Sequence, residues 1–195
     1  MPDLLVLGFD TSAAHCAAAL LSGDRLISAR QEEMAKGQAE RLMPMIEEML
    51  ADVGLSWRDL TLIGVGTGPG NFTGIRISVA AARGLALSLG IPAIGIGAAE
   101  ALAYGLPRPC RIVIPTRREM AIWQDFGDAP TEPQQGPLDA LPPGPPVIQP
   151  RMTVAEGIAR LALARSASAQ PRPAPIYLRP ADAAPARDRG PVILP

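Results

Sequence analysis

Residues 66–76 of the chain are GTGPGNFTGIR, and this stretch decides the fold. It joins an apolar run typical of a buried strand to a long run, 72–89, that is apolar on nearly every side. Glycines let backbone N–H groups approach an anion at the start of a helix. A helix that is apolar on most sides has to be covered on more than one face. The first property predicts a phosphate-binding ancestry, and the second predicts a partner protein.

The composition excludes several classes of protein. The net charge of −1 does not favour binding nucleic acid by the chain alone. His15 is the single histidine, so a metal site built on two histidines is excluded. The two cysteines, Cys16 and Cys110, are far apart, which is typical of a reduced, cytoplasmic protein. A start without a basic segment and the lack of a long uncharged run predict neither a signal peptide nor a membrane span.

The distribution of proline divides the chain. Only 4 of the 22 prolines precede residue 106, so we expect an N-terminal lobe over residues 1–105 with regular structure. Its predicted order is βββαβαβα, which belongs to the α/β class. The predicted strands are 4–9, 16–21, 25–30, 62–65 and 93–96, and the predicted helices are 38–53, 72–89 and 98–104.

A reduced, proline-rich second lobe is expected over residues 106–180, followed by an extended tail at 181–195. Residues 111–114 and 120–126 are predicted to pair as a hairpin. Residues 129–150 are too rich in proline for regular structure. A last helix is predicted over 154–165, because Thr153 and Glu156 have the spacing of a capping box.

The two long helices of the first lobe carry more apolar surface than one sheet needs. Apolar residues of the helix at 38–53 cover a wide arc, and small residues recur along the helix at 72–89 at spacings of four and three. A helix buried inside one domain would look similar, so both interpretations stay open. The residues predicted to contact a partner are Leu42, Met45, Met49, Gly74, Ser78, Ala81 and Leu85.

A second candidate site lies where the first and fourth strands are predicted to end. Asp10, Thr11 and Ser12, together with Gly68 and Gly70, are residue types that hold a nucleotide phosphate and metal-bound water in kinase-like folds. A tight structural turn would use the same residues. No P-loop lysine is present, and no nucleophile elbow accompanies the single histidine. The sequence therefore predicts no catalytic residues and no metal ligands.

Several motifs resemble the bacterial TsaB family, the dimerisation subunit of the tRNA N6-threonylcarbamoyladenosine transferase complex. The similarity covers residues 4–104 and is carried by motifs at 7–12, 40–44, 68–76, 84–86 and 89–92, with a C-terminal signature at 175–179. Gln38 stands where many members have histidine, and residues 116–119 keep only part of the family's hairpin.

The resemblance implies an ASKHA (actin, sugar kinase, Hsp70-like) fold without catalytic residues of its own. It implies pairing, through the two long helices, with the catalytic paralogue TsaD, which transfers a threonylcarbamoyl group to N6 of adenosine 37 in tRNA. The ATPase TsaE and tRNA are expected to join the complex. The resemblance leaves open whether ATP or ADP with Mg²⁺ binds at the subunit junction, and whether the chain forms a homodimer when alone.

Two rival functions use other residues. A small ASKHA-fold ATPase or phosphotransferase would act through Asp10, Thr11 and the loop 68–70. A peptidase, the older glycoprotease description, would need a nucleophile or metal site that the sequence does not supply.

Overall fold

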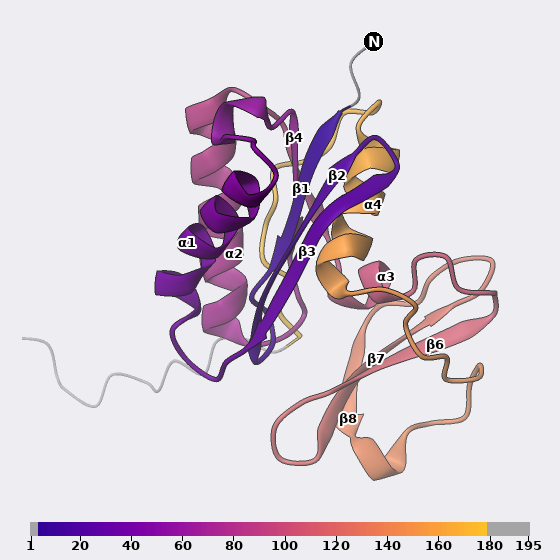
Figure 1. Cartoon of the computed structure of the whole chain (residues 1–195). Helices are drawn as coiled ribbons and strands as arrows, with labels where there is room; N and C mark the ends of the chain where they lie inside the picture. The colour runs from indigo at the N-terminus through magenta and orange to yellow at the C-terminus, as the bar shows by residue number, and fades with distance from the viewer. Residues whose placement is uncertain (1–3, 179–195) are drawn as a thin grey trace, which may run out of the picture.

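The computed structural model describes residues 4–178, and its main element is a five-stranded sheet in the order β3-β2-β1-β4-β5 (Figure 1). Strands β1, β2 and β3 are antiparallel neighbours, whereas β4 and β5 continue the sheet parallel to β1. The strands are β1 (Leu5–Asp10), β2 (His15–Ser22), β3 (Arg25–Glu33), β4 (Leu62–Gly66) and β5 (Ala93–Ile96). The predicted α/β order of the first lobe is confirmed over residues 4–105.

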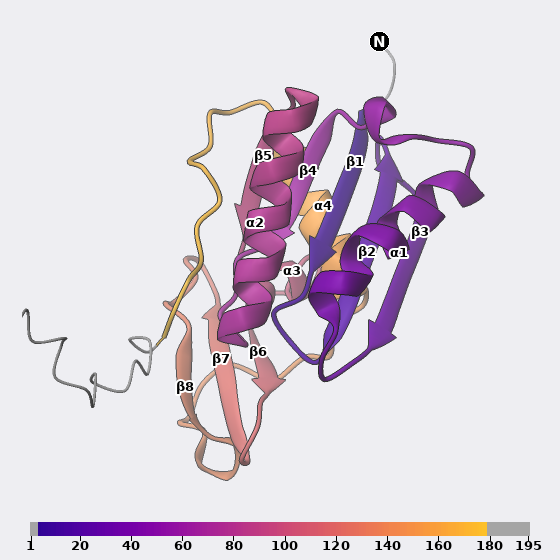
Figure 2. The same cartoon turned by 90° about the vertical axis from the view of Figure 1, so that its left-hand side faces the viewer.

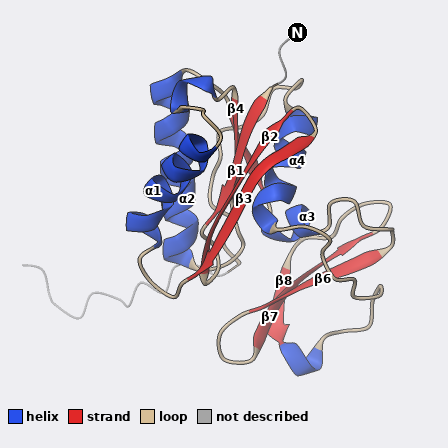
Figure 3. Cartoon of the chain, viewed as in Figure 1, coloured by secondary structure: helices blue, strands red, loops and turns tan. Residues whose placement is uncertain are grey.

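Helices cover both faces of this sheet (Figure 3). One face carries α1 (Gln38–Asp52) and α2 (Phe72–Leu89), and a short 3₁₀ helix, η1 (Trp57–Asp59), follows α1. The other face carries α4 (Val154–Arg165), with the short α3 (Ala98–Leu102) beside it. Because β1 and β4 are covered on both sides, they are buried along their whole length, as strands in the middle of an α/β sheet are.

Two glycines bring α4 against the sheet. A Cβ atom at Gly8 would overlap the backbone of Ala155, and one at Gly64 would overlap Ile158 and Ala162. The helix therefore packs in direct contact with β1 and β4, through alanines and Ile158 that are fully buried. The assignment of this helix to the second lobe is corrected: it completes the core of the first.

By length and composition alone, α2 is apolar enough to cross a membrane. Its inward face, with Ile75, Val79 and Ala82, is buried against the sheet, as in a core helix of a globular protein. Only 28% of its residues are buried, however. The outer side of this apolar helix is left without cover within the described chain.

The second lobe is a three-stranded antiparallel sheet in the order β6-β7-β8. Its strands are β6 (Cys110–Pro115), β7 (Met120–Phe126) and β8 (Gln134–Pro137), followed by the 3₁₀ helix η2 (Leu138–Ala140). The predicted hairpin is confirmed, but the expectation that 129–150 lacks regular structure is wrong at β8. Gln134 to Gly136 pair as an edge strand, and Pro137 ends it, a position that proline tolerates.

Arg111 holds the long loop after η2 in place. Its side chain is buried, forms a bidentate ion pair with Asp125, and donates a hydrogen bond to the carbonyl of Pro142. The hydrogen bond to Asp125 raises the pKa of Arg111 above its usual range. Residues 142–148 are held both by this side chain and by the backbone of Arg111. Its N–H donates to the carbonyl of Pro146, and its carbonyl accepts from the N–H of Ile148.

After α4 the chain returns along the edge of β5 toward the start of α2 (Figure 2). Pro173 lies against Gly95, and the N–H of Ile176 donates to the carbonyl of Thr67. Tyr177 then stacks on Phe72 with ring centroids 4.8 Å apart, and its hydroxyl accepts a hydrogen bond from Arg76. The predicted tail at 181–195 lies outside the described residues, as does the last residue of the 175–179 signature.

Candidate functional site

The first candidate site lies where β1 and β4 end. Because these strands are parallel neighbours, Asp10 and Gly66 come to the same edge of the sheet, where α/β folds bind ligands. The turn after β1 and the glycine loop after β4 therefore meet, as the sequence predicts.

The turn and the loop pack directly on each other. The N–H of Asn71 donates to the carbonyl of Ser12 over 2.6 Å, and the hydroxyl of Thr11 donates to the carbonyl of Gly74. A Cβ atom at Gly70 would overlap the carbonyl of Ser12. The glycines thus allow a backbone-to-backbone contact that leaves no room for a side chain between the two segments.

Asp10 organises the turn. Its Oδ2 accepts hydrogen bonds from the N–H and the hydroxyl of Ser12, both at 2.9 Å, and lies 2.8 Å from Nε2 of His15. Since an ionised carboxylate only accepts hydrogen bonds, Nε2 of His15 carries the proton in this pair. The other oxygen, Oδ1, is buried against Gly66 without a hydrogen-bond partner among the described residues. Such an orphaned atom is uncommon in a folded protein.

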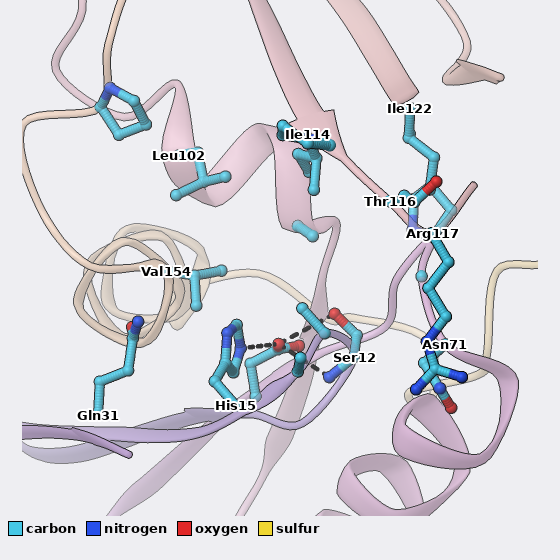
Figure 4. Close-up of a pocket in the computed structure, with 18 of the residues that line it drawn as sticks. Ser12, His15, Gln31, Asn71, Leu102, Ile114, Thr116, Arg117, Ile122 and Val154 are labelled. Atoms are coloured by element: carbon cyan, nitrogen blue, oxygen red, sulfur yellow. Dashed lines mark hydrogen bonds and ion pairs between the residues drawn. The ribbon is translucent and has the colours of Figure 1, made fainter. Parts of the chain in front are cut away.

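A cavity of about 1020 Å³ opens in front of Asp10, between the five-stranded and three-stranded sheets (Figure 4). Its floor includes Ser12 and His15, and its apolar walls include Leu102, Ile114 and Val154. Gln31 and Gln38 add amide groups at one side. At the position where many TsaB-like sequences have histidine, the amide of Gln38 donates to the carbonyl of Met34.

Three arginines line the same cavity and did not emerge from the sequence as candidates. Arg117 and Arg118 come from the turn between β6 and β7, and Arg151 precedes α4. The turn holds Arg118 and Glu119 at φ 59° and 55°, a conformation in which Asn-Gly is the usual pair. The signal available in the sequence was the Arg-Arg pair inside a predicted hairpin turn.

The residues predicted to contact a partner lie mostly in the core. Leu42, Met45 and Met49 are 0–1% exposed because they point from α1 onto the sheet. Gly74 and Ser78 are also buried, and the hydroxyl of Ser78 bonds to the carbonyl of Gly66. Only Ala81 and Leu85 keep partial exposure, between α2 and the core. The assignment of the five buried residues to a partner surface is therefore corrected.

The stripe of α2 that points away from the sheet lies one residue earlier in the sequence than the stripe predicted to contact a partner. The residues of this stripe recur at the same spacings of four and three. Thr73, Ala80, Gly84 and Leu87 are exposed, whereas Ile77 is half-buried against the core. Leu87 is 86% exposed, and Met43 on the neighbouring α1 is 36% exposed. We call Met43, Ala80, Gly84 and Leu87 the outer helix face; Figure 2 shows the two helices that carry it lying side by side on the sheet.

Comparisons with known proteins agree with this architecture. The family model described as TsaD, tRNA N6-adenosine threonylcarbamoyltransferase, matches residues 28–126. An uncharacterized protein of Mycobacterium bovis is 30% identical over 201 residues, which cover 92% of this chain and 94% of that protein. The tRNA threonylcarbamoyladenosine biosynthesis protein TsaB of Escherichia coli is 35% identical over 100 residues, 51% of this chain and 43% of that protein.

The chain belongs to the TsaB family. The TsaB protein of Bacillus subtilis is 37% identical over 100 residues, 51% of this chain and 44% of its own length. The chain thus matches less than half of the length of these curated TsaB proteins. The fold is that of YeaZ from Pseudomonas aeruginosa, with a TM-score of 0.73 at 23% identity over 90% of this chain and all of that one.

In this TsaB-family chain, the described residues contain no group of three histidine, cysteine or acidic side chains that could hold a metal ion. The sequence motifs of the family fall on the packed turn, the glycine loop and α2. They therefore explain the scaffold of the first lobe, whereas the arginine-lined cavity depends on the second lobe.

Proposed function

We propose that this chain is a noncatalytic subunit with an ASKHA-type lobe that pairs with a TsaD-like catalytic paralogue. In this proposal the paralogue transfers a threonylcarbamoyl group to N6 of adenosine 37 in tRNA, and this chain stabilises and positions it. The single observation that carries the proposal is the outer helix face, an apolar surface that the described chain leaves uncovered.

The chemistry of the outer helix face suits another helix pair. Ala80 and Gly84 are small and lie one helical turn apart, so a second helix can approach closely there. Leu87 projects beside them and is 86% exposed. Burying a leucine side chain contributes about 2 kcal/mol to association. A related partner that presents the same two helices would complete a four-helix bundle across a pseudo-twofold axis.

The names of the relatives support the biological setting. Curated relatives at 35–37% identity are called tRNA threonylcarbamoyladenosine biosynthesis proteins, and the family model that matches this chain is named for TsaD. The match to that model supports a paralogous partner of similar fold. We further propose a cytoplasmic complex that a TsaE-like ATPase and tRNA join, with ATP or ADP and Mg²⁺ at the subunit junction. The same face would support a homodimer when the partner is absent.

The proposal is tested by coexpression of this chain with the TsaD-like protein. Leu87→Glu is expected to abolish copurification while the variant keeps the thermal midpoint of the unaltered chain. Leu138→Glu is the matched control, because Leu138 is 42% exposed but lies in the second lobe. Depletion of the protein is expected to lower the threonylcarbamoyladenosine content of cellular tRNA. Copurification that survives Leu87→Glu would contradict the assigned surface, and unchanged tRNA would contradict the function.

A second candidate function is an ATPase or phosphotransferase. The orphaned Oδ1 of Asp10, beside the glycine loop, is the observation that favours it. Steady ATP turnover by the isolated chain, lost in Asp10→Ala, would support this function. The turn and the loop are in backbone contact at Ser12 and Gly70, so the phosphate would have to lie in the cavity that these residues line and not between them.

A further inference from the structure

We propose that the partner that covers the outer helix face presents acidic side chains to α2 and basic side chains to α1. This inference rests on the proposed pairing with a TsaD-like protein, and it adds the charge pattern that this protein must present. The residues that carry it are exposed charged side chains at the borders of the outer helix face: Arg76 and Arg83 on α2, and Glu40 and Glu47 on α1.

The two arginines lie along one side of α2. They are seven residues apart, which is close to two helical turns, so their side chains leave the helix in nearly the same direction. Ala80 and Leu87 each follow one of the arginines by four residues and are therefore its neighbours on the helix surface. A partner helix that covers Ala80 and Leu87 must also cover part of both arginines.

The side chain of Arg76 is held in a position to bind a carboxylate. Its guanidinium lies 3.9 Å from the centroid of the Phe72 ring, and its Nε donates a 3.0 Å hydrogen bond to the hydroxyl of Tyr177. Tyr177 in turn stacks on Phe72. Because only Nε is used among the described residues, both terminal nitrogens of Arg76 remain available, and guanidinium groups bind carboxylates through paired N–H donors.

Nothing in the described chain neutralises the arginines of α2. The helix itself contains no acidic residue. Within residues 4–178, neither Arg76 nor Arg83 forms an ion pair, although the arginines of β3 and α1 do. The border of the outer helix face on α2 is therefore positively charged.

The border on α1 carries the opposite charge. Glu40 and Glu47 lie three residues before and four residues after Met43, so all three share one side of the helix. Neither carboxylate forms an ion pair within the described part of the chain, whereas the adjacent Glu48 pairs with Arg30 and Arg41. The charges are thus separated, with basic side chains along α2 and acidic ones along α1.

This separation determines the chemistry of the partner surface. A charged side chain that loses water on association, without gaining a partner of opposite charge, weakens binding. Like charges placed opposite each other suppress a wrong arrangement. The partner therefore needs Asp or Glu over α2 and Lys or Arg over α1. The same pattern fixes the orientation of docking, because the reversed orientation would place like charges together.

The test measures the affinity of the full chain for the purified TsaD-like protein by calorimetry, at low and at high salt. Arg76→Ala and Arg83→Ala are each expected to weaken binding about tenfold at low salt, because each leaves a carboxylate of the partner unpaired. The double variant should also lose less affinity than the unaltered chain when salt is added, since fewer charges remain to be screened. Glu47→Ala tests the border on α1 and should weaken binding in the same way.

Arg25→Ala is the matched control and should leave the affinity unchanged. Arg25 is exposed and adjoins Asp24, whose carbonyl accepts a hydrogen bond from Arg160 of α4 on the other face of the sheet. Thermal midpoints are measured for all variants. Arg83→Ala removes no hydrogen bond within residues 4–178, so its loss of affinity reports on charge even if Arg76→Ala loosens the contact with Tyr177.

The outcomes separate this inference from the proposed function. Binding of the unaltered chain together with equal affinities for Arg76→Ala, Arg83→Ala and Arg25→Ala would overturn the charge pattern and leave the pairing intact. An unchanged salt dependence in the double variant would do the same. No binding by the unaltered chain would overturn the pairing as well. A salt-sensitive homodimer in sedimentation, without binding of the TsaD-like protein, would assign the surface to a second copy of this chain and contradict the proposed partner.

Discussion

The side-chain hydroxyl of Thr11 donates a 2.6 Å hydrogen bond to the main-chain carbonyl of Gly74, 63 residues further along the chain. This bond fastens the turn after β1 to the first turn of α2. The two segments can approach this closely because residue 74 is glycine: a Cβ atom at Gly74 would overlap the carbonyl of Thr11. The hydrogen bond and the close contact thus join the edge of the sheet to the helix that carries the outer face.

Gly74→Ala is expected to lower the free energy of unfolding by about 3 kcal/mol, because the added methyl group displaces backbone rather than a flexible side chain. Gly84→Ala is the matched change, since a Cβ atom there meets nothing within 4 Å. It should raise the free energy of unfolding by about 0.5–1 kcal/mol through higher helix propensity. Urea unfolding of the two variants measures both effects. Equal stability of the variants would contradict the close contact at Thr11.

Two adjacent alanines of α2 should respond in opposite ways to a charge. Ala80 is exposed on the outer helix face, whereas Ala81 packs against the core cluster between α1 and the sheet. Ala80→Asp is expected to abolish copurification with the TsaD-like protein and leave the thermal midpoint unchanged. Ala81→Asp is expected to destabilise the isolated chain by about 2 kcal/mol, because it desolvates a carboxylate. If Ala81→Asp proves as stable as Ala80→Asp, the rotation of α2 assigned here is wrong.

The ion pairs on the surface of α1 predict a dependence of stability on pH. Hydrogen bonds from Arg41, and then from Arg30, lower the pKa of Glu48 to about 2. Because the folded pKa lies below the unfolded value, Glu48 contributes stability above pH 4.5 and loses that contribution as the pH falls toward 2. The effect is small, since the carboxylate is half exposed and screened by solvent.

Urea midpoints of the unaltered chain and of Glu48→Gln, measured from pH 7 to pH 3, test this dependence. The difference between the two proteins should be largest at pH 7 and shrink below pH 4.5. Glu47→Gln, at the exposed neighbouring position, should show no such trend. A difference that grows on acidification would contradict the sign.

Burial in β2 should make Cys16 unreactive. The side chain is fully buried, and desolvation raises the pKa of its thiol to about 11. At pH 8 the thiolate, which is the reactive form, falls about a hundredfold below its usual fraction. Alkylation by iodoacetamide, followed by peptide mass spectrometry, should therefore be at least a hundredfold slower in the native chain than in urea. Equal rates would mean that β2 opens readily beneath α1.

Much of the first lobe was predictable because its signals are local. Apolar runs and the uneven distribution of proline give the elements in their correct order. In the structure Asn71 caps α2 by accepting a hydrogen bond from the N–H of Gly74. The meeting of Asp10 with the glycine loop also follows from sequence, since parallel strands end at the same edge. Which stripe of α2 faces the sheet does not follow from the sequence. Small residues fill two adjacent stripes of this helix, and no local signal distinguishes them.

Less of the second lobe was predictable from the sequence. Its proline content correctly indicated loops, yet β8 forms because β7 offers an unpaired edge to the short segment before Pro137. Likewise, nothing in the sequence distinguishes Arg117 and Arg151 from other arginines. They are far apart along the chain, and only the fold places both of them around the cavity. No local sequence signal predicts either the strand β8 or the grouping of these arginines.

The sequence by itself determined the order of strands and helices in the first lobe, the family, and the surplus of apolar surface on two helices. These depend on periodicity and on motifs that lie within a few residues of one another. Only the tertiary structure decided which stripe of α2 faces outward, that α4 crosses back to cover β1 and β4, and that three arginines share one cavity with Asp10. Each of these depends on which surfaces of distant segments fit closely enough to exclude water, and that complementarity exists only in the folded chain.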